Sequence, residues 1–251
     1  MSRPSPRSNR RLIHDSSTID NGREGILRLS AVEAHDLWSQ TYDRIANPLL
    51  ALEERTLEPL LPKADRAFVL DVACGTGRWL EKLMRQGAGC AVGIDLSRKM
   101  LVQGRRKPLL ERCLVQADGS ALPVRTCTVD LAICSFAVSY VRELDGFAGE
   151  LARVLRSGGA LFLSDFHPSG YARGWRRCFR HEGRVIEISS FDYSLHDIRR
   201  VFAAAGFKRV CEAQPNFGEE ERSFFQARGK EDLFAQACNG PAIYICGFVR
   251  A

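Results

Sequence analysis

Residues 69–77 read Val-Leu-Asp-Val-Ala-Cys-Gly-Thr-Gly, an apolar run that carries one acid and ends at two closely spaced glycines. Val69, Leu70 and Val72 are typical of a buried parallel strand. The two glycines allow a tight turn with positive φ and expose bare backbone N–H groups, and a helical pattern over residues 78–86 follows. This order of strand, glycine turn and helix favours a loop that cradles a cofactor, although ordinary strand-to-helix turns also contain glycine pairs.

The spacing of the glycines separates two classes of cofactor. The dinucleotide fingerprint G-x-G-x-x-G needs a third glycine, but Leu80 occupies that position, so a nicotinamide fold is disfavoured. The segment instead resembles the D-x-x-x-G-x-G motif of class I S-adenosylmethionine-dependent methyltransferases, and it is particularly similar to the quinone-biosynthesis C-methyltransferase branch. The resemblance implies S-adenosyl-L-methionine as cofactor and places four residues of the loop beside it: Asp71, Ala73, Gly75 and Gly77.

A second apolar strand, residues 90–95, ends in another acid. The carboxylate of Asp95 can accept two hydrogen bonds from a ribose diol, and the neighbouring Leu96 is free to cover an adenine face. Asp95 and Ser97 can equally cap the helix that begins near Arg98. We expect both roles together.

Three further segments follow in the order that the family has. A third strand over residues 113–117 leads to a loop similar to the one that reads the adenine amino group, with Asp118 and Gly119 as its contacts. A fourth strand, residues 129–134, opens at Ser135. Residues 153–165 resemble the family's R-V-L-x-x-G-G helix end, punctuated by Ser157-Gly158-Gly159, and its fifth strand.

The remaining elements complete the predicted fold. A helix over residues 194–205 is followed by strand six (208–213) and strand seven (242–249), and by resemblance strand seven inserts antiparallel between strands five and six. The predicted class is α/β: a Rossmann-like seven-stranded, mostly parallel sheet with helices on both faces. Residues 26–251 are expected to form a single domain.

Composition restricts the environment of the protein. The chain has 251 residues, 45% of them hydrophobic and 26% charged, which is ordinary for a globular domain. It contains no apolar run long enough for a membrane span and no secretory signal pattern, so a cytoplasmic location is expected. Its nine cysteines lack C-x-x-C spacing, which favours reduced thiols and predicts no metal site.

Residues 1–25 differ from the rest of the chain. Four arginines (Arg3, Arg7, Arg10 and Arg11) precede the first acid, Asp15, and contribute much of the formal net charge of +6. We predict a disordered basic tail. The absence of a basic stripe elsewhere in the sequence argues against nucleic-acid binding.

Residues 31–60 read as one helix in which Trp38, Tyr42, Ile45 and Leu49 share a face. The segment Trp38-Ser-Gln-Thr-Tyr42-Asp43 resembles the pre-core W-x-x-x-Y-D segment that folds over the cofactor. A helical lid over residues 31–60 is therefore implied, with Tyr42 at the cofactor or in the acceptor pocket. A packed helix stripe is the alternative.

The segment 166–193 concentrates aromatic side chains and arginines. This composition suits a flat, anionic or polyoxygenated ligand, so the segment is interpreted as a substrate insertion. A hairpin that turns at Glu182-Gly183, with some of the aromatic side chains only covering the sheet edge, is the alternative. The long connection 214–240 is expected to hold another helix near the mouth of the pocket.

Methyl transfer from a sulfonium requires alignment of nucleophile, methyl group and sulfur, and removal of the acceptor proton where one exists. His167 is the favoured catalytic base because it follows the fifth strand at its carboxyl end, and loop capping is the alternative. His35, Tyr140 and His196 are weaker candidates. No Asn/Asp-Pro-Pro-aromatic run follows strand four, which argues against methylation of nucleobase amines.

The sequence thus predicts methyl transfer from S-adenosyl-L-methionine to oxygen or carbon of a small, aromatic or quinone-like acceptor. Two alternatives remain: a cofactor-binding protein without transferase activity, and an RNA-directed methyltransferase that uses the basic tail. The oligomeric state is left open.

Overall fold

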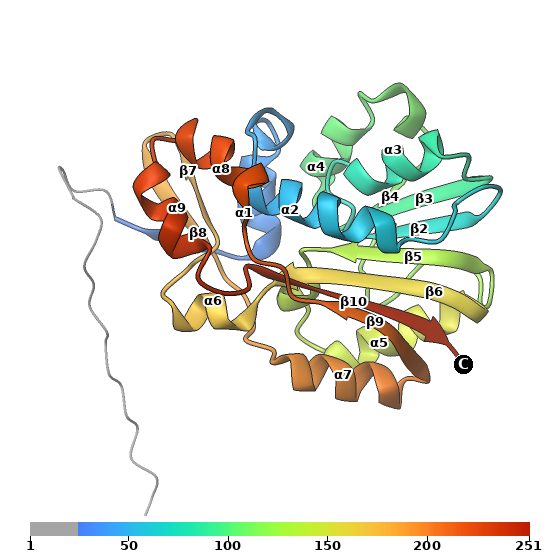
Figure 1. Cartoon of the computed structure of the whole chain (residues 1–251). Coiled ribbons are helices and arrows are strands. Elements are labelled where there is room, and N and C mark those ends of the chain that lie inside the picture. Colours follow the sequence, from blue (N-terminus) through green and yellow to red (C-terminus); the bar gives the residue numbers. More distant parts are fainter. Residues whose placement is uncertain (1–24) are drawn as a thin grey trace, which may run out of the picture.

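A central seven-stranded sheet dominates the computed structural model, which describes residues 25–251 (Figure 1). The predicted tail thus lies, apart from Gly25, outside the described residues. The strand order is β4 (Leu114–Gln116), β3 (Cys90–Asp95), β2 (Phe68–Val72), β5 (Val129–Ser135), β6 (Leu155–Phe166), β10 (Ile243–Arg250) and β9 (Phe207–Ala213).

The direction of the strands confirms the predicted fold class. The pairs β2–β3, β3–β4, β2–β5 and β5–β6 are parallel. Strand β10 lies antiparallel between β6 and β9, with Ile245 opposite Ser164 on one side and Ala213 on the other. The carboxyl ends of the parallel strands therefore meet at one edge of the sheet.

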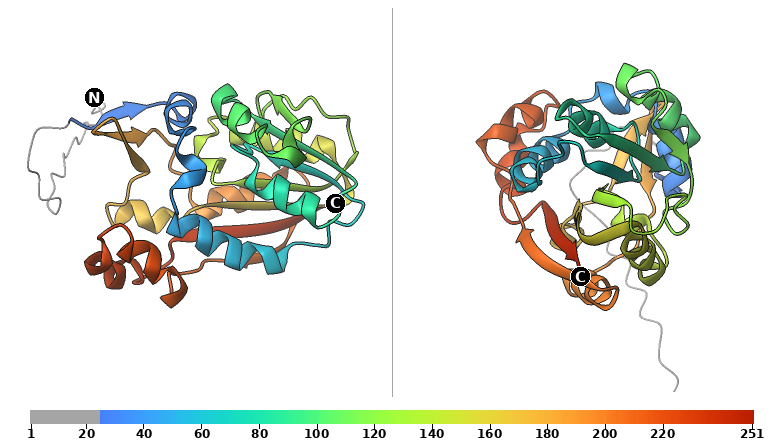
Figure 2. Two further views of the ribbon diagram at one scale, coloured as in Figure 1. Left: turned by 90° about the horizontal axis from the view of Figure 1, so that it is seen from above. Right: turned by 90° about the vertical axis from the view of Figure 1, so that its right-hand side faces the viewer.

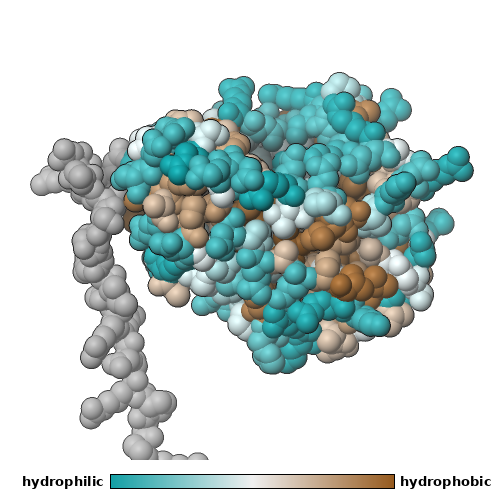
Figure 3. Space-filling view, viewed as in Figure 1, coloured by the Kyte–Doolittle hydropathy of each residue, from teal (hydrophilic) through white to brown (hydrophobic). Residues whose placement is uncertain are grey.

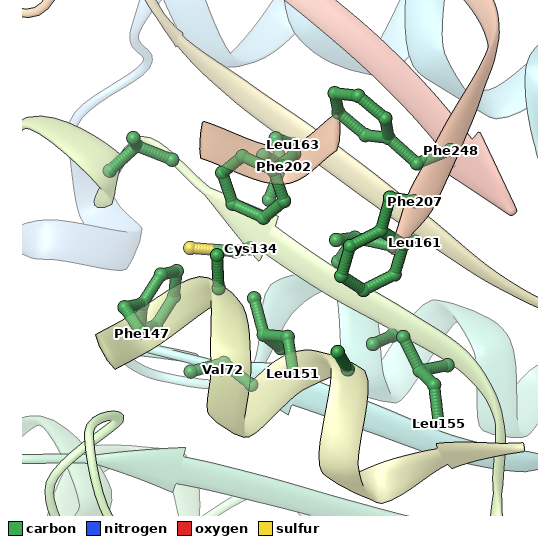
Figure 4. Close-up of a cluster of buried hydrophobic side chains, with 14 of the residues drawn as sticks. Val72, Cys134, Phe147, Leu151, Leu155, Leu161, Leu163, Phe202, Phe207 and Phe248 are labelled. Carbon is green, nitrogen blue, oxygen red and sulfur yellow. The ribbon is translucent and has the colours of Figure 1, made fainter. Parts of the chain in front are cut away.

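Helices cover both faces of the sheet (Figures 1 and 2). Helices α5 (Leu144–Val154) and α7 (Leu195–Ala204) bury their apolar stripes on one face, where Phe147, Leu151 and Phe202 pack against strand residues such as Cys134 (Figure 4). Helices α2 (Pro48–Leu57), α3 (Arg78–Arg85) and α4 (Arg98–Gly104) contribute Leu52, Leu80 and other side chains to the core on the opposite face. Each fully buried Leu or Phe contributes about 1.5–3 kcal/mol.

A second, three-stranded sheet has the order β1 (Leu27–Leu29), β8 (Arg184–Ile188) and β7 (Cys178–His181). Strands β7 and β8 form the hairpin considered above, with Glu182 at φ 48° and Gly183 at φ 79°, as a two-residue type I′ turn requires. Strand β1 pairs with β8 in parallel, which joins the segment before α1 (Ala31–Trp38) to the segment 166–193.

The predicted single helix over residues 31–60 is wrong. The segment is divided into α1, the helical turn η1 (Tyr42–Arg44), α2 and the turn η2 (Glu58–Leu60). Asn47 caps α2 by accepting from the backbone N–H of Leu49, and Pro48 occupies its first position, where no backbone N–H is needed. Ile45 consequently leaves the predicted stripe and is largely exposed.

Smaller differences concern the ends and number of helices. Helix α5 ends at Val154, and residues 155–159 already belong to β6, because the segment pairs with β5 from Leu155 onward. The connection 214–240 holds two helices, α8 (Glu219–Gln226) and α9 (Glu231–Ala237), where one was expected. A short α6 (Pro168–Ala172) follows β6, and η3 (Pro108–Leu110) and η4 (Val138–Tyr140) are further helical turns.

Hydrophilic side chains cover most of the face seen in Figure 3, and the apolar ones gather in small patches. Within residues 25–251, no helix is long and apolar enough to cross a membrane. The same residues contain no group of three or more His, Cys, Asp or Glu side chains that could hold a metal ion. All nine cysteines are free thiols.

Candidate cofactor and acceptor site

A cavity of ≈ 1910 Å³ opens at the carboxyl ends of β2, β3, β5 and β6. Pockets for one small molecule usually measure about 300–1,000 Å³, so this cavity has room for two ligands. Its walls come from the glycine loop, from α1 and η1, from the segment 173–180 and from the α8–α9 region. All ten residues predicted at the cofactor except Gly77 line it: Tyr42, Asp71, Ala73, Gly75, Asp95, Leu96, Asp118, Gly119 and Ser135.

The two glycines of the loop have different roles. Gly75 (φ +56°) faces open space, since a Cβ added there would meet nothing within 4 Å. Gly77 (φ +77°) is the residue before α3, and a Cβ there would come 2.5 Å from Leu110 Cδ1. Gly75 thus leaves backbone accessible to a ligand, whereas Gly77 is required for the turn and for packing on η3.

Asp71 is buried near the end of β2 and lines the cavity. Its Oδ1 has no hydrogen-bond partner among residues 25–251. Burial raises the pKa of Asp71 to about 7, although the Arg78 guanidinium acts in the opposite direction. A positively charged group in the cavity would supply the missing partner and favour the ionised carboxylate.

Asp95 connects the glycine loop with the end of β3. Its Oδ2 accepts from Gly75 N and its Oδ1 from Ser97 N, each at 2.7 Å. Each carboxylate oxygen keeps a further lone pair for a ligand hydroxyl. Burial raises the pKa of this group. The predicted cap is present as well, since Ser97 Oγ accepts from Met100 N at the start of α4.

Leu96 and Asp118 border the same part of the cavity. The Leu96 side chain is 45% exposed, which is unusual for a leucine beside buried strands and leaves an apolar face available. Asp118 Oδ1 accepts from both Ser120 N and Ser120 Oγ at 2.8 Å. A Cβ at Gly119 would come 2.9 Å from Phe147, so only glycine lets this loop pack on α5.

A buried ion pair behind the loop was not predicted. Glu53 on α2 is fully buried and pairs with Arg78, which follows Gly77. Ser135 Oγ donates to Glu53 Oε1 at 2.7 Å and Trp79 Nε1 donates to Glu53 Oε2 at 3.1 Å. Ser135 is therefore held by Glu53 at the edge of the cavity. The sequence signal for this pair was Glu53 itself, an acid among the leucines of α2. The spacing of the sequence did not indicate that Arg78 is its partner.

Tyr42 lies at the wall formed by η1. Its ring meets Trp38 edge-on at 4.9 Å, and burial raises the pKa of its hydroxyl. The neighbouring Asp43 accepts from Thr76 Oγ1 of the glycine loop at 2.6 Å. The W-x-x-x-Y-D segment thus packs on the loop.

His167 does not line the cavity. It caps α6 by accepting at Nδ1 from Ser169 N (3.1 Å), which leaves Nε2 to donate to Gln214 Oε1 (3.1 Å). Burial lowers the pKa of its ring. Both ring nitrogens are engaged in contacts that match the capping alternative, and its role as a base stays a prediction.

The walls formed by residues 173–180 and by the α8–α9 region are cationic and aromatic. Arg177 is buried, pairs with Asp165, and donates to Tyr140 Oη and Phe136 O at 3.2 Å. Trp38 stacks on Phe179 at 4.8 Å with an interplanar angle of 6°. The cationic residues that line the cavity from these walls are Arg173, Arg176, Arg177, Arg180, Arg228 and Lys230.

Comparison with known proteins shows which family the glycine loop and the strands after it resemble. Residues 69–159 match the family model described as "Methyltransferase domain". This segment is similar to class I S-adenosylmethionine-dependent methyltransferases, and the fold of the chain resembles theirs. The similarity favours S-adenosyl-L-methionine over a nicotinamide dinucleotide as the class of cofactor.

Among its relatives, malonyl-(acyl-carrier protein) O-methyltransferase of Methylovorus sp. is 31% identical over 181 residues, which are 66% of this chain and 59% of the relative. A ubiquinone/menaquinone biosynthesis C-methyltransferase of Roseobacter denitrificans is 35% identical over 120 residues, 45% of this chain and 48% of the relative. The chain thus spans about half to three fifths of the length of these relatives.

The fold has close counterparts among solved structures. An S-adenosylmethionine-dependent methyltransferase from Mesorhizobium loti superposes with a TM-score of 0.65 at 21% identity, over 81% of this chain and all of that chain. The similarity extends beyond the matched domain to most of residues 25–251, which confirms the predicted architecture.

Proposed function

We propose that this protein transfers the methyl group of S-adenosyl-L-methionine to an oxygen or carbon of a small, aromatic or quinone-like acceptor with an anionic or polyoxygenated group. The observation that carries the proposal is the division of one cavity into two chemically different parts. Acids and bare backbone surround the glycine loop, while cations and aromatic rings line the opposite walls. A cytoplasmic location belongs to the same proposal and rests on composition.

The first part of the cavity fits the cofactor. In this proposal Asp95 accepts from the ribose hydroxyls, Leu96 covers the adenine, and Asp118 and Gly119 lie at its amino group. The unpartnered Oδ1 of Asp71 pairs with the ammonium of the methionine moiety. The backbone of Ala73 and Gly75 adjoins the methionine end, Ser135 borders it, and Tyr42 closes the lid. Gly77, predicted at the cofactor, instead shapes the turn into α3.

The second part suits a flat acceptor with oxygen substituents. Arg177 is held in place by Asp165 and Tyr140, so its charge is fixed and balanced. Further arginines of the segment 173–180 add donors, and the Trp38–Phe179 stack offers an aromatic wall. We propose that residues 166–193 form the acceptor insertion and residues 31–60 the lid.

The cofactor supplies an electrophilic methyl group on a sulfonium, and the chain has to align the acceptor with it. Hydrogen bonds hold the walls of the cavity in place for this alignment. Gly75 N of the glycine loop donates to Asp95, and Thr76 of the same loop donates to Asp43 of η1. The Arg78–Glu53 pair holds α2 against the same loop. Bound acceptor and cofactor would exclude water from the space between them.

A carboxylate acceptor on an acyl thioester is the second candidate. It rests on the similarity to the malonyl-(acyl-carrier protein) O-methyltransferase over 66% of the chain. A carboxylate needs no base, and the cationic walls would attract it as well.

The test measures S-adenosylhomocysteine formation with three acceptor groups: catechols and quinols, a malonyl thioester, and RNA. Product with the first group alone supports the leading proposal, and product with the thioester alone supports the second candidate. Tight binding of the cofactor by calorimetry without product from any group or from a metabolite extract would favour a binding protein without transferase activity. Methylated RNA that disappears on deletion of residues 1–24 would favour the RNA alternative.

A further inference from the structure

His35 on α1 presents an unpaired ring nitrogen at the cavity. Its Nδ1 lies 2.7 Å from the carbonyl oxygen of Ala31. A carbonyl oxygen only accepts, so Nδ1 carries the proton and Nε2 has a free lone pair. Nε2 has no hydrogen-bond partner within residues 25–251, and His35 lines the cavity.

The surroundings hold this ring where the two parts of the cavity meet. The Tyr140 ring meets it edge-on at 5.4 Å, and the Trp38 ring lies 6.0 Å away. Asp36 on the same helix accepts from Ser97 Oγ at 2.5 Å, which fastens α1 to the end of β3. His35 thus stands beside both the ribose acid of the proposed cofactor site and the aromatic wall.

Burial favours the neutral form of the ring. Burial lowers the pKa of His35, and Arg177 acts in the same direction. The hydrogen bond to Ala31 and the carboxylates of Asp36 and Asp95 act in the opposite direction, more weakly than burial. A neutral imidazole with a bare Nε2 is the form that accepts a proton.

The other candidates lack this combination. Tyr140 Oη already accepts from Arg177, and burial raises the pKa of Tyr140, so it keeps its proton at neutral pH. Within residues 25–251, His35 is the one histidine that lines the cavity.

We propose that Nε2 of His35 removes the acceptor proton during methyl transfer, which deepens the function proposed above and rests on it. The O–H or C–H bond of the acceptor breaks and its proton passes to Nε2, giving an imidazolium. The released electron pair forms the new bond to the methyl group, while the electron pair of the S–CH₃ bond stays on sulfur as a neutral thioether. The imidazolium later returns its proton to solvent. The acceptor is therefore a proton-bearing nucleophile such as a phenol or quinol.

The decisive variant is His35→Asn, because the Asn amide can still donate to Ala31 O but offers no base. Lys63→Asn, at an exposed residue outside the cavity lining, introduces the same side chain away from the site and is the control. With the catechol or quinol that gives product in the screen above, His35→Asn should lower kcat by about 10²–10⁴-fold, and the control should not. The deficit should shrink at high pH, where the acceptor ionises without help. S-adenosylhomocysteine affinity by calorimetry should stay within about threefold of the parent.

A second measurement does not depend on turnover. Nitrogen-15 histidine spectra of the complex with S-adenosylhomocysteine should show His35 neutral, with the proton on Nδ1, at pH 7.5. An imidazolium or the Nε2–H tautomer would overturn the proposal. So would unchanged kcat in His35→Asn, or a loss confined to cofactor affinity. If the parent methylates no acceptor, the proposed function fails, whatever the histidine spectra show.

Discussion

At the scale of single residues, Asp95 links the glycine loop to the end of β3. Its carboxylate accepts from Gly75 N and Ser97 N, and in our proposal also from the ribose. We expect Asp95→Ala to weaken S-adenosylhomocysteine binding by roughly ten- to hundredfold, since a charge-assisted hydrogen bond contributes about 1.5–3 kcal/mol. Calorimetry measures this. Asp130→Asn, at the start of β5 and outside the cavity lining, is the control, and equal affinity of the Asp95 variant and the parent would refute the assignment.

If Asp71 binds the cofactor ammonium as we propose, cofactor affinity depends on pH. Its pKa of about 7 is raised by burial, so the free protein holds a proton there that the unfolded chain releases near pH 4. This contribution to stability is complete below about pH 4 and is lost as the pH rises through 7. Pairing with the cofactor ammonium requires the ionised form, so affinity should rise between pH 6 and 8 and binding should release protons.

Calorimetry in two buffers of different ionisation enthalpy counts the protons released. Asp71→Asn cannot ionise, and it should bind more weakly with a flatter pH dependence. A parent affinity that stays constant from pH 6 to 8, with no proton release, would separate Asp71 from the ammonium.

The site illustrates which residues a sequence can reveal. Asp71 and Asp95 were predictable because parallel strands place their carboxyl ends at one edge, whatever else surrounds them. The buried Glu53–Arg78 pair and the Nε2 contact of His167 with Gln214 were not. These contacts join segments 25 and 47 residues apart, and nothing in local spacing specifies them.

At the scale of elements, substitutions of His167 distinguish its role as the cap of α6 from a role as catalytic base. As the cap of α6, its replacement by Ala should cost about 0.5–2 kcal/mol of stability, whereas Asn is a good cap and should preserve it. If His167 is the base predicted from the sequence, both variants should lose about 10²–10⁴-fold in turnover. From its contacts, we expect His167→Asn to retain turnover and stability. Denaturant unfolding and steady-state kinetics on both variants measure the two effects separately.

The N-terminal helices show why element boundaries escape prediction. The apolar period of residues 31–60 continues through Asn47-Pro48, and proline is acceptable at the first position of a helix, so periodicity alone did not reveal a break. Strand β1 has three residues, too few for a period, and its partner β8 follows more than 150 residues later. The hairpin was predictable because Glu182-Gly183 carries its own turn signal.

At the scale of the whole molecule, two truncations separate the tail from the fold. A chain that begins at Gly25 should keep the melting temperature and cofactor affinity of the parent, because the composition of residues 1–24 offers little apolar surface to bury. A chain that begins at Ala31 loses β1 and the capping box of Ser30 with Glu33. Its melting temperature should fall by about 2–8 °C, given ~1–2 kcal/mol for these contacts.

Differential scanning calorimetry compares the two truncated chains with the parent. A large loss of stability in the chain that begins at Gly25 would mean that the preceding residues dock on the domain. Equal melting temperatures for all three chains would show that β1 and its pairing with β8 do not measurably stabilise the protein.

The position of β10 has a consequence for synthesis of this protein on the ribosome. Strand β6 pairs with β5 on one side, but its neighbour on the other side is β10, the last strand in the chain, and β9 joins the sheet through β10. At ~5–20 residues per second, the roughly 80 residues that follow β6 take about 4–16 s to be made. Throughout that interval the nascent sheet has an open apolar edge that strands of other chains can join. A slow step or a pause in translation after β6 should therefore lower the yield of folded protein more than one placed before β2.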